Sequence, residues 1–309
     1  MADIVDLWEK PEAQEVYMIA GWRQWADGGS MSSGLPRYLI QQTEARPIGT
    51  IRAEGFYMFQ IPGTHDLVRP VVKFDEGYPE SLEERRNELF YNGDDKRGVV
   101  FFLGDEPHLD IEGYSTAFLD AAQALKVKRI IVLGGVYGEL PYDKERLVSG
   151  SYSLPNLKEE MRDYAVNLSD YHGGASIGAY ICRRAGERGM ELVGFYAFVP
   201  TYSVSKVTQI GNTIHVENDF VAWHGVMRRI NHMLKIGFDL SDLEQKREQL
   251  IRVIAAKVEE LDEAEPQLKV HEYMARLSEG FTEMPFNPLG DVWAQEIDRL
   301  FNDSDSEED

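Results

Sequence analysis

The chain has 309 residues, 43% of them hydrophobic, and its 53 aspartate and glutamate residues against 32 lysine and arginine residues leave a formal net charge of −21. The apolar fraction is that of a folded globular protein and lies far above that of acidic disordered chains. So negative a charge repels phosphate backbones and anionic lipid, so we expect no nucleic-acid partner and no membrane partner.

The cysteine content and the N-terminus favour a cytoplasmic protein. The single cysteine, Cys182, cannot form an internal disulfide or build a thiolate metal site alone. The first residues carry acids where a signal peptide needs a basic segment and an apolar core. The seven histidines show no metal-ligand spacing, so we expect no metal site, and no motif predicts a cofactor.

Through the first two thirds of the chain, β-rich runs alternate with helical patterns, which is typical of parallel strands joined by crossover helices. The apolar runs 99–103 and 130–133 flank the helical pattern 115–125 and predict a βαβ unit. Residues 47–74 predict strands around a Pro62-Gly63 turn, and hence a mixed sheet with an antiparallel part. We expect four strands to stop at a glycine or proline, namely 16–20, 99–103, 130–133 and 192–199.

Beyond the α/β pattern the composition changes to charged helices, with an apolar stripe at helical spacing along 240–261. We interpret this part as helices packed on their own sheet rather than a free coiled coil, because Lys246 and Arg247 interrupt the heptads. The last residues are acidic and carry no apolar side chain, which predicts disorder. The expected division is an α/β domain (1–237), a helical C-terminal extension (238–301) and a disordered acidic tail (302–309).

Ligands of open α/β sheets bind outside the carboxyl ends of the parallel strands, so the loops there are the first candidates for a site. The loop 21–30 offers Trp22 and Asp27, with glycines that let backbone approach a ligand; a capped turn with packed tryptophans is the alternative. The next loop offers Glu106 as a general acid or base or a hard-metal ligand. Alternatively, Glu106 and Asp110 serve as caps of the helix that begins near Gly113.

The third loop, 134–141, contains Gly134, Gly135 and Tyr137, which form either the floor of a pocket or a tight chain reversal.

Residues 174–178 match G-x-S-x-G, the turn that exposes the serine of a hydrolase. Asp219 with His224 or His232 follows in the order of a catalytic triad. However, no apolar strand precedes Ser176, which argues against a serine hydrolase.

Taken in order, these loops resemble those of the PAC2 family, named after a proteasome assembly chaperone, and in particular its bacterial branch. The resemblance extends over about residues 16–260 and depends on the order of six short motifs. Thr201 departs from the histidine usual in the family, which removes a polar group there. The motifs are Gly21-Trp22 with Asp27-Gly28, Arg69-Pro70 with Val71-Val72, 103–107, 133–135, 171–174 and 199–202.

The resemblance implies a three-layer α/β/α fold with a mixed sheet, similar to that of nucleoside phosphorylases and hydrolases, and a helical C-terminal extension. It also implies a homo-oligomer, with a trimer as the expected state. We therefore expect a non-catalytic assembly factor or scaffold that acts through protein–protein contacts. Its exposed apolar patch is expected on the helices of residues 217–261.

The alternative is an enzyme or small-molecule sensor with a nucleoside-phosphorylase-like pocket at the strand ends. In that pocket Arg69 would bind an anionic group and Glu106 would act as acid or base, which requires the two side chains to lie close together. A sensor would keep an aromatic lining without the chemistry. The candidate pocket residues are Trp22, Asp27, Arg69, Glu106, Gly134, Gly135, Tyr137 and Tyr202.

Overall fold

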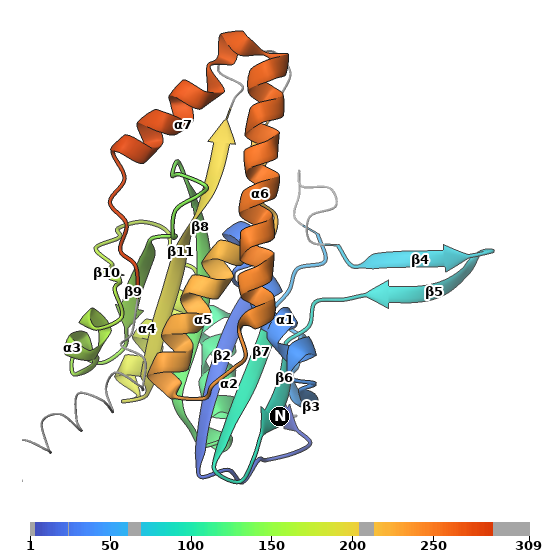
Figure 1. Cartoon of the computed structure of the whole chain (residues 1–309). Helices are drawn as coiled ribbons and strands as arrows, with labels where there is room; N and C mark the ends of the chain where they lie inside the picture. The colour runs from blue at the N-terminus through green and yellow to red at the C-terminus, as the bar shows by residue number, and fades with distance from the viewer. Residues whose placement is uncertain (1–3, 24, 61–68, 204–212, 287–309) are drawn as a thin grey trace, which may run out of the picture.

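A computed structural model of the chain describes residues 4–23, 25–60, 69–203 and 213–286. It is built on a ten-stranded mixed sheet (Figure 1). The strands of this sheet are β1 (Val5–Leu7), β2 (Glu15–Arg23), β3 (Arg46–Ile51), β6 (Glu88–Gly93), β7 (Arg97–Asp105), β8 (Val127–Gly138), β9 (Val148–Tyr152), β10 (Asn167–Leu168), β11 (Glu191–Ser203) and β12 (Thr213–His215).

The sheet order is β1-β3-β6-β7-β2-β8-β11-β9-β10, with β12 paired to β11. The central strands β7, β2, β8 and β11 are parallel, whereas β6 and β9 pair antiparallel with β7 and β11 on either side. The expected mixed sheet is therefore confirmed, and the carboxyl ends of its four parallel strands meet at one edge.

Helices cover both faces of the sheet and complete the three layers. Alternate residues of β2 point to opposite faces, so Met18 and Ala20 join one buried cluster while Tyr17 and Ile19 join the other. The helices α2 and α4 cover the first face, and α1 and α5 cover the second. The helices are α1 (Gly34–Gln42), α2 (Ile111–Ala124), α3 (Leu157–Arg162), α4 (Ile177–Glu187), α5 (Phe220–Leu234), α6 (Ser241–Ala264) and α7 (Val270–Glu279).

The βαβ unit predicted around residues 99–133 is confirmed as β7, α2 and β8. The four strands do not stop at the glycine or proline that was expected to end them. For example, β8 continues through Gly134 and Gly135 to Gly138, and β11 continues through Pro200, which pairs with Gly138. Glycine tolerates extended backbone and here permits close approach of a neighbouring segment, so it does not break the strand.

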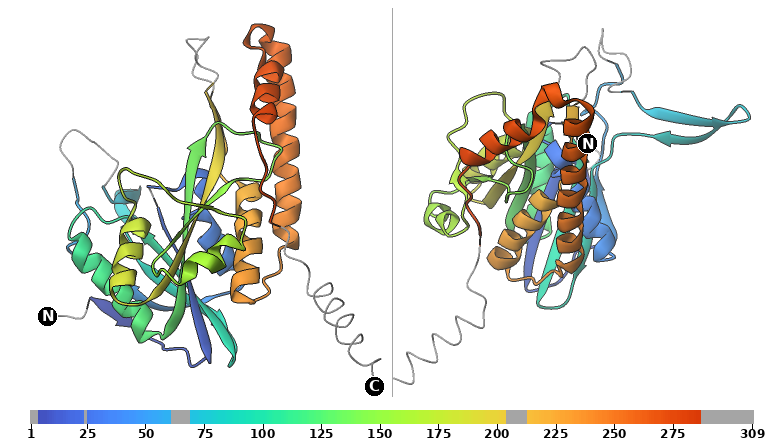
Figure 2. Two further views of the ribbon diagram at one scale, coloured as in Figure 1. Left: turned by 90° about the vertical axis from the view of Figure 1, so that its left-hand side faces the viewer. Right: turned by 45° about the horizontal axis from the view of Figure 1, so that its top comes forward.

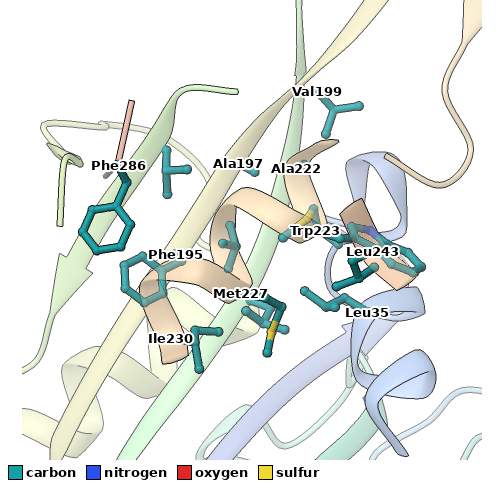
Figure 3. Close-up of a cluster of buried hydrophobic side chains, with 14 of the residues drawn as sticks. Leu35, Phe195, Ala197, Val199, Ala222, Trp223, Met227, Ile230, Leu243 and Phe286 are labelled. Carbon is teal, nitrogen blue, oxygen red and sulfur yellow. The ribbon is translucent and has the colours of Figure 1, made fainter. Parts of the chain in front are cut away.

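The helix α5 packs on the sheet and α6 packs on α5, both through their apolar residues (Figure 3). Trp223 and Met227 of α5 lie against the sheet, and Leu243, Ile254 and Val258 of α6 are buried in the same cluster. The predicted stripe of α6 thus packs on its own chain. The expectation of an exposed apolar patch on the helices of 217–261 is wrong, because this cluster takes up their apolar face.

The boundaries predicted for the extension and the tail are not settled by this packing. Residues 287–301 of the predicted extension and the predicted tail, 302–309, lie outside the described residues. The division into domains therefore stays a prediction. In the described part of the chain, every helix is too short or too polar to cross a membrane.

A two-stranded hairpin, β4 (Val71–Asp75) and β5 (Tyr78–Glu83), projects from the body on its own (Figures 1 and 2). We call it the arm. Its two turn residues, Glu76 and Gly77, have φ values of +44° and +88°, which is the conformation of tight hairpin turns. The turn predicted at Pro62-Gly63 lies outside the described residues.

Candidate functional site

Trp22, the first candidate, lies near the carboxyl end of β2 and belongs to the core beneath α2. Its side chain packs against Phe102 and Phe118, and its Nε1 donates to the Tyr114 hydroxyl at 2.8 Å. Its backbone N–H donates to Ser32 Oγ, also at 2.8 Å. The alternative of a packed tryptophan therefore holds for Trp22.

Asp27 organises the turn that leads from β2 into α1. Its Oδ1 accepts from the backbone N–H groups of Ser32 and Ser33 at 2.8 and 2.9 Å, and its Oδ2 accepts from the Ser33 hydroxyl at 2.6 Å. Burial raises the pKa of Asp27, and these hydrogen bonds act in the opposite direction. The carboxylate thus caps the turn, which was one of the two interpretations of this loop.

The glycines after β2 and in β8 let two stretches of backbone touch. A Cβ on Gly135 would lie 1.9 Å from the carbonyl oxygen of Gly28, and a Cβ on Gly134 would lie 2.3 Å from a ring carbon of Tyr196. The Tyr137 hydroxyl accepts at 3.3 Å from a backbone N–H of the 3₁₀ turn η1 (Gly28–Ser30). The space over both glycines is therefore filled, and they form neither a pocket floor nor a chain reversal.

Glu106 follows β7 and caps α4, the helix on the same face of the sheet as α2. Its Oε1 accepts from the backbone N–H of Ile177 at 2.8 Å, where the helix dipole favours a carboxylate. Burial raises the pKa of Glu106. Asp110 caps α2 by accepting from Gly113 N at 3.0 Å. The cap predicted near Gly113 is confirmed for Asp110, but the prediction is wrong for Glu106, which caps α4 instead.

Asp105, which sequence reasoning passed over, is a buried carboxylate at this edge that binds two arginines. It is buried at the end of β7 and accepts from Arg23 Nη1 and Arg85 Nη1, each at 2.9 Å, and from Arg86 N at 3.1 Å. Arg85 and Arg86 are the residues through which the chain returns from the arm to β6. The only sequence signal was an acid two residues after the apolar run 99–103.

A hydroxyl–amide network connects this cluster to Tyr57 and Tyr114. The Tyr57 hydroxyl lies 2.7 Å from Asn87 Oδ1 and 2.8 Å from the carbonyl oxygen of Asp105. The Tyr114 hydroxyl donates to Asn87 Oδ1 at 2.9 Å. Arg85, Arg86 and Asn87 follow the arm directly, so buried polar contacts with Asp105 and Tyr57 hold the root through which the chain leaves the arm.

Arg69 lies outside this network, on the exposed segment that enters the arm. It donates to Gln60 Oε1 at 2.6 Å, and its guanidinium lies 4.8 Å from the centre of the Phe59 ring. Glu106 is instead bonded to the start of α4. The structure therefore records no contact between Arg69 and Glu106, the pair that the enzyme alternative needed.

Tyr202, the last candidate, is fully buried near the end of β11. Its hydroxyl donates to the carbonyl oxygen of Leu140, and its ring meets that of Tyr273 on α7. It belongs to the buried cluster on the α1 and α5 face, whereas Trp22 belongs to the cluster on the opposite face. The two side chains therefore do not line one cavity.

The serine-hydrolase motif is not an active site. Ser176 is the N-cap of α4, and its Oγ accepts from Ala179 N at 3.2 Å. Asp219 caps α5 and forms a fully buried ion pair with Arg146, with 2.8 Å between Oδ2 and Nε. Both candidate histidines lie within α5. Among the described residues, no group of three or more His, Cys, Asp or Glu side chains could hold a metal ion.

Comparison with known proteins identifies a family and several solved structures that this chain resembles. The family model described as "PAC2 family" matches residues 21–258. A PAC2 family protein of Streptomyces avermitilis has a similar structure at 24% identity, covers 84% of this chain and 99% of its own, and has a TM-score of 0.65. No curated protein matches the chain.

Two further similar structures carry names that refer to the proteasome. A proteasome-assembly chaperone homologue of Mycobacterium tuberculosis is 22% identical, covers 78% of this chain and 94% of its own, and has a TM-score of 0.65. An archaeal proteasome activator of Pyrococcus furiosus, PbaB, is 19% identical, covers 82% and 98%, and has a TM-score of 0.58. At these identities the similarity concerns the fold.

Proposed function

This chain belongs to the PAC2 family, and from that premise we propose that it is a non-catalytic, homo-oligomeric assembly factor or scaffold that acts through protein–protein contacts in the cytoplasm. The expected state is a trimer. The names of the similar structures, an assembly-chaperone homologue and a proteasome activator, support an assembly role with a protein partner.

The arm is the observation that carries this proposal. Every residue of β4 and β5 is exposed, yet the arm contains several large apolar side chains. A soluble monomer rarely leaves such side chains together on one projecting element, and such patches usually mark interaction sites. The exposed large apolar residues of the arm are Val71, Val72, Phe74, Tyr78 and Leu82.

The strand ends support the non-catalytic part of the proposal. Asp27, Asp105 and Glu106 each accept hydrogen bonds that fix a turn, the arm or a helix. A general acid or base must instead reach a substrate proton. The enzyme or sensor alternative also needed Trp22 and Tyr202 in one pocket, and we propose no second function.

The oligomeric state of the full chain in solution tests the proposal. Light scattering coupled to size exclusion, over a dilution series, is expected to give a mass three times that of one chain at high concentration. Glu106→Gln provides a control because it alters a helix cap and leaves the arm intact, so its mass should match. A native chain that stays monomeric at every concentration would contradict the proposal.

A further inference from the structure

The arm has one face of four apolar residues and one mainly polar face, which also carries Val71 and Tyr78. Cross-strand partners share a face, and the pairs Val72 with Leu82 and Phe74 with Pro79 place four apolar residues together. Val72, Phe74 and Leu82 are 44%, 59% and 52% exposed. An isolated two-stranded hairpin is marginally stable in water, so this face needs a covering surface.

The opposite face and the turn make the arm acidic. Lys73 on the polar face forms an ion pair with Glu80. Residues 71–84 contain this one lysine and five acidic residues, all of them exposed. A surface that covers the apolar face would therefore bind best if it combined apolar side chains with positive charge at its rim.

The same chain carries such a surface beside the roots of the arm. A shallow groove of about 250 Å³ lies against β3 and β6, and Trp8, Pro47 and Phe90 contribute its apolar lining. Trp8 is 61% exposed. Arg85 and Arg86 line the groove with Glu88, and the guanidinium of Arg86 is largely exposed, 3.9 Å from Glu88. Exposed tryptophan and arginine are the residue types that dominate binding energy at interfaces.

We propose that the apolar face of the arm docks in the groove of a second copy of this chain, with the acidic end of the arm, at Asp75 and Glu76, close to the exposed Arg86 of that copy. The arm of the same chain projects away from the body (Figure 1), and none of its residues lines the groove. Arm and groove are different surfaces, so the contact is head-to-tail and closes either by exchange between two copies or as a ring. The inference deepens the proposed function and rests on its homo-oligomer.

Substitutions on the two faces of the arm provide the first test. Val72→Ser and Val71→Ser make the same chemical change on adjacent residues whose side chains point to opposite faces. Sedimentation velocity of the full chain should show weaker self-association for Val72→Ser than for Val71→Ser. Phe74→Ser and Leu82→Ser should each weaken it by about thirty-fold, as expected for central apolar anchors. Far-UV circular dichroism and the melting temperature confirm that each variant is folded.

Complementation between two defective chains tests the arm-to-groove contact itself. Leu82→Ser damages the arm and keeps the groove, whereas the double variant Trp8→Ala, Arg86→Glu damages the groove and keeps the arm. Neither variant should associate alone at a concentration where the native chain does. Their mixture should form pairs, because the intact arm of one meets the intact groove of the other.

The outcomes separate the inference from the proposed function. If the native chain is monomeric throughout, both are overturned. If the native chain associates but the arm variants associate equally well, or the mixture of defective chains forms no pairs, the homo-oligomer stands and the arm-to-groove contact is overturned.

Discussion

Two elements of this chain project beyond the sheet: the helical hairpin α6–α7 and the arm β4–β5 (Figures 1 and 2). They differ in whether their apolar side chains are buried. The helical hairpin buries Leu243, Val258 and Leu261 of α6 and Met274 of α7. The arm buries none of its side chains. The apolar side chains of the helical hairpin pack within the chain, whereas those of the arm are exposed.

The difference separates residues that stabilise the fold from residues that are available for association. Truncation of a buried apolar side chain removes packing that the monomer needs, so its effect is on unfolding. Truncation of an exposed one leaves the monomer's stability nearly unchanged. We therefore expect substitutions of buried residues to lower the free energy of unfolding, and substitutions of exposed residues to leave it nearly unchanged.

The buried ion pair beneath α5 should give the largest effect. Arg146→Met leaves Asp219 as an unpaired buried charge and also removes the donor to three backbone carbonyls. We expect the free energy of unfolding to fall by about 3–5 kcal/mol in urea denaturation. Arg162→Met is the matched control, since Arg162 and its partner Glu159 are largely exposed. Equal effects of the two substitutions would contradict this account.

Leu243→Ala should weaken the packing of α6 and destabilise the chain. Leu243 is fully buried where α6 packs in the cluster of α5 and the sheet (Figure 3). Its truncation should cost about 2–5 kcal/mol of unfolding free energy, measured in the same way. Val253→Ala changes an exposed residue of the same helix and should stay within about 0.5 kcal/mol of the native chain. A cost at Val253 as large as at Leu243 would mean that α6 is oriented differently.

Asp105→Asn should loosen the root of the arm at residues 85–87, at a smaller cost in unfolding free energy. Arg23 and Arg85 are partly exposed, so water can solvate them when the carboxylate charge is removed. We expect a loss of about 1–3 kcal/mol and faster amide hydrogen exchange at residues 85–87. Glu83→Gln neutralises an exposed acid of the arm and should leave that exchange unchanged. Unchanged exchange in Asp105→Asn would show that the carboxylate does not hold the arm.

The smallest effect concerns pH and Glu106. Burial raises the folded-state pKa of this acid above its ordinary value of 4.5, so the folded state binds the proton more tightly than the unfolded state. The resulting stability is fully present below about pH 4.5 and is lost as the pH rises through the folded-state pKa. Relative to Glu106→Gln, the native chain should therefore gain stability as the pH falls, by less than about 1 kcal/mol because the carboxyl is partly exposed. Urea denaturation of both chains at several pH values tests this. A native chain that loses stability relative to Glu106→Gln as the pH falls would contradict the prediction.

Local patterns were sufficient to predict much of the fold and several of the caps. The apolar runs around 99–133 identified the βαβ unit, and the stripe along 240–261 identified α6, because burial on two faces or along one stripe leaves a periodic trace. Asp27 and Asp110 bond to backbone within six residues of themselves, so their roles as caps were accessible from sequence.

The remaining features depend on contacts between distant segments. Asp105 meets Arg23 and Arg85, which lie 82 and 20 residues away, and Gly135 meets Gly28 across the sheet edge. No local pattern specifies such pairs. Alternation along the arm marks its apolar side, but only the three-dimensional arrangement shows that nothing in the described part of the chain covers it.

Hydrogen–deuterium exchange of the full chain at low and high protein concentration tests the central claim most directly. We expect the amides of residues 71–83 to exchange fast in dilute protein and to become protected as the chain associates, together with those near Trp8 in the groove. Protection along α6 and α7 should be the same at both concentrations. If the chain associates while exchange in the arm stays fast, or if the protected residues lie on α6 and α7, the arm is not the element through which copies meet.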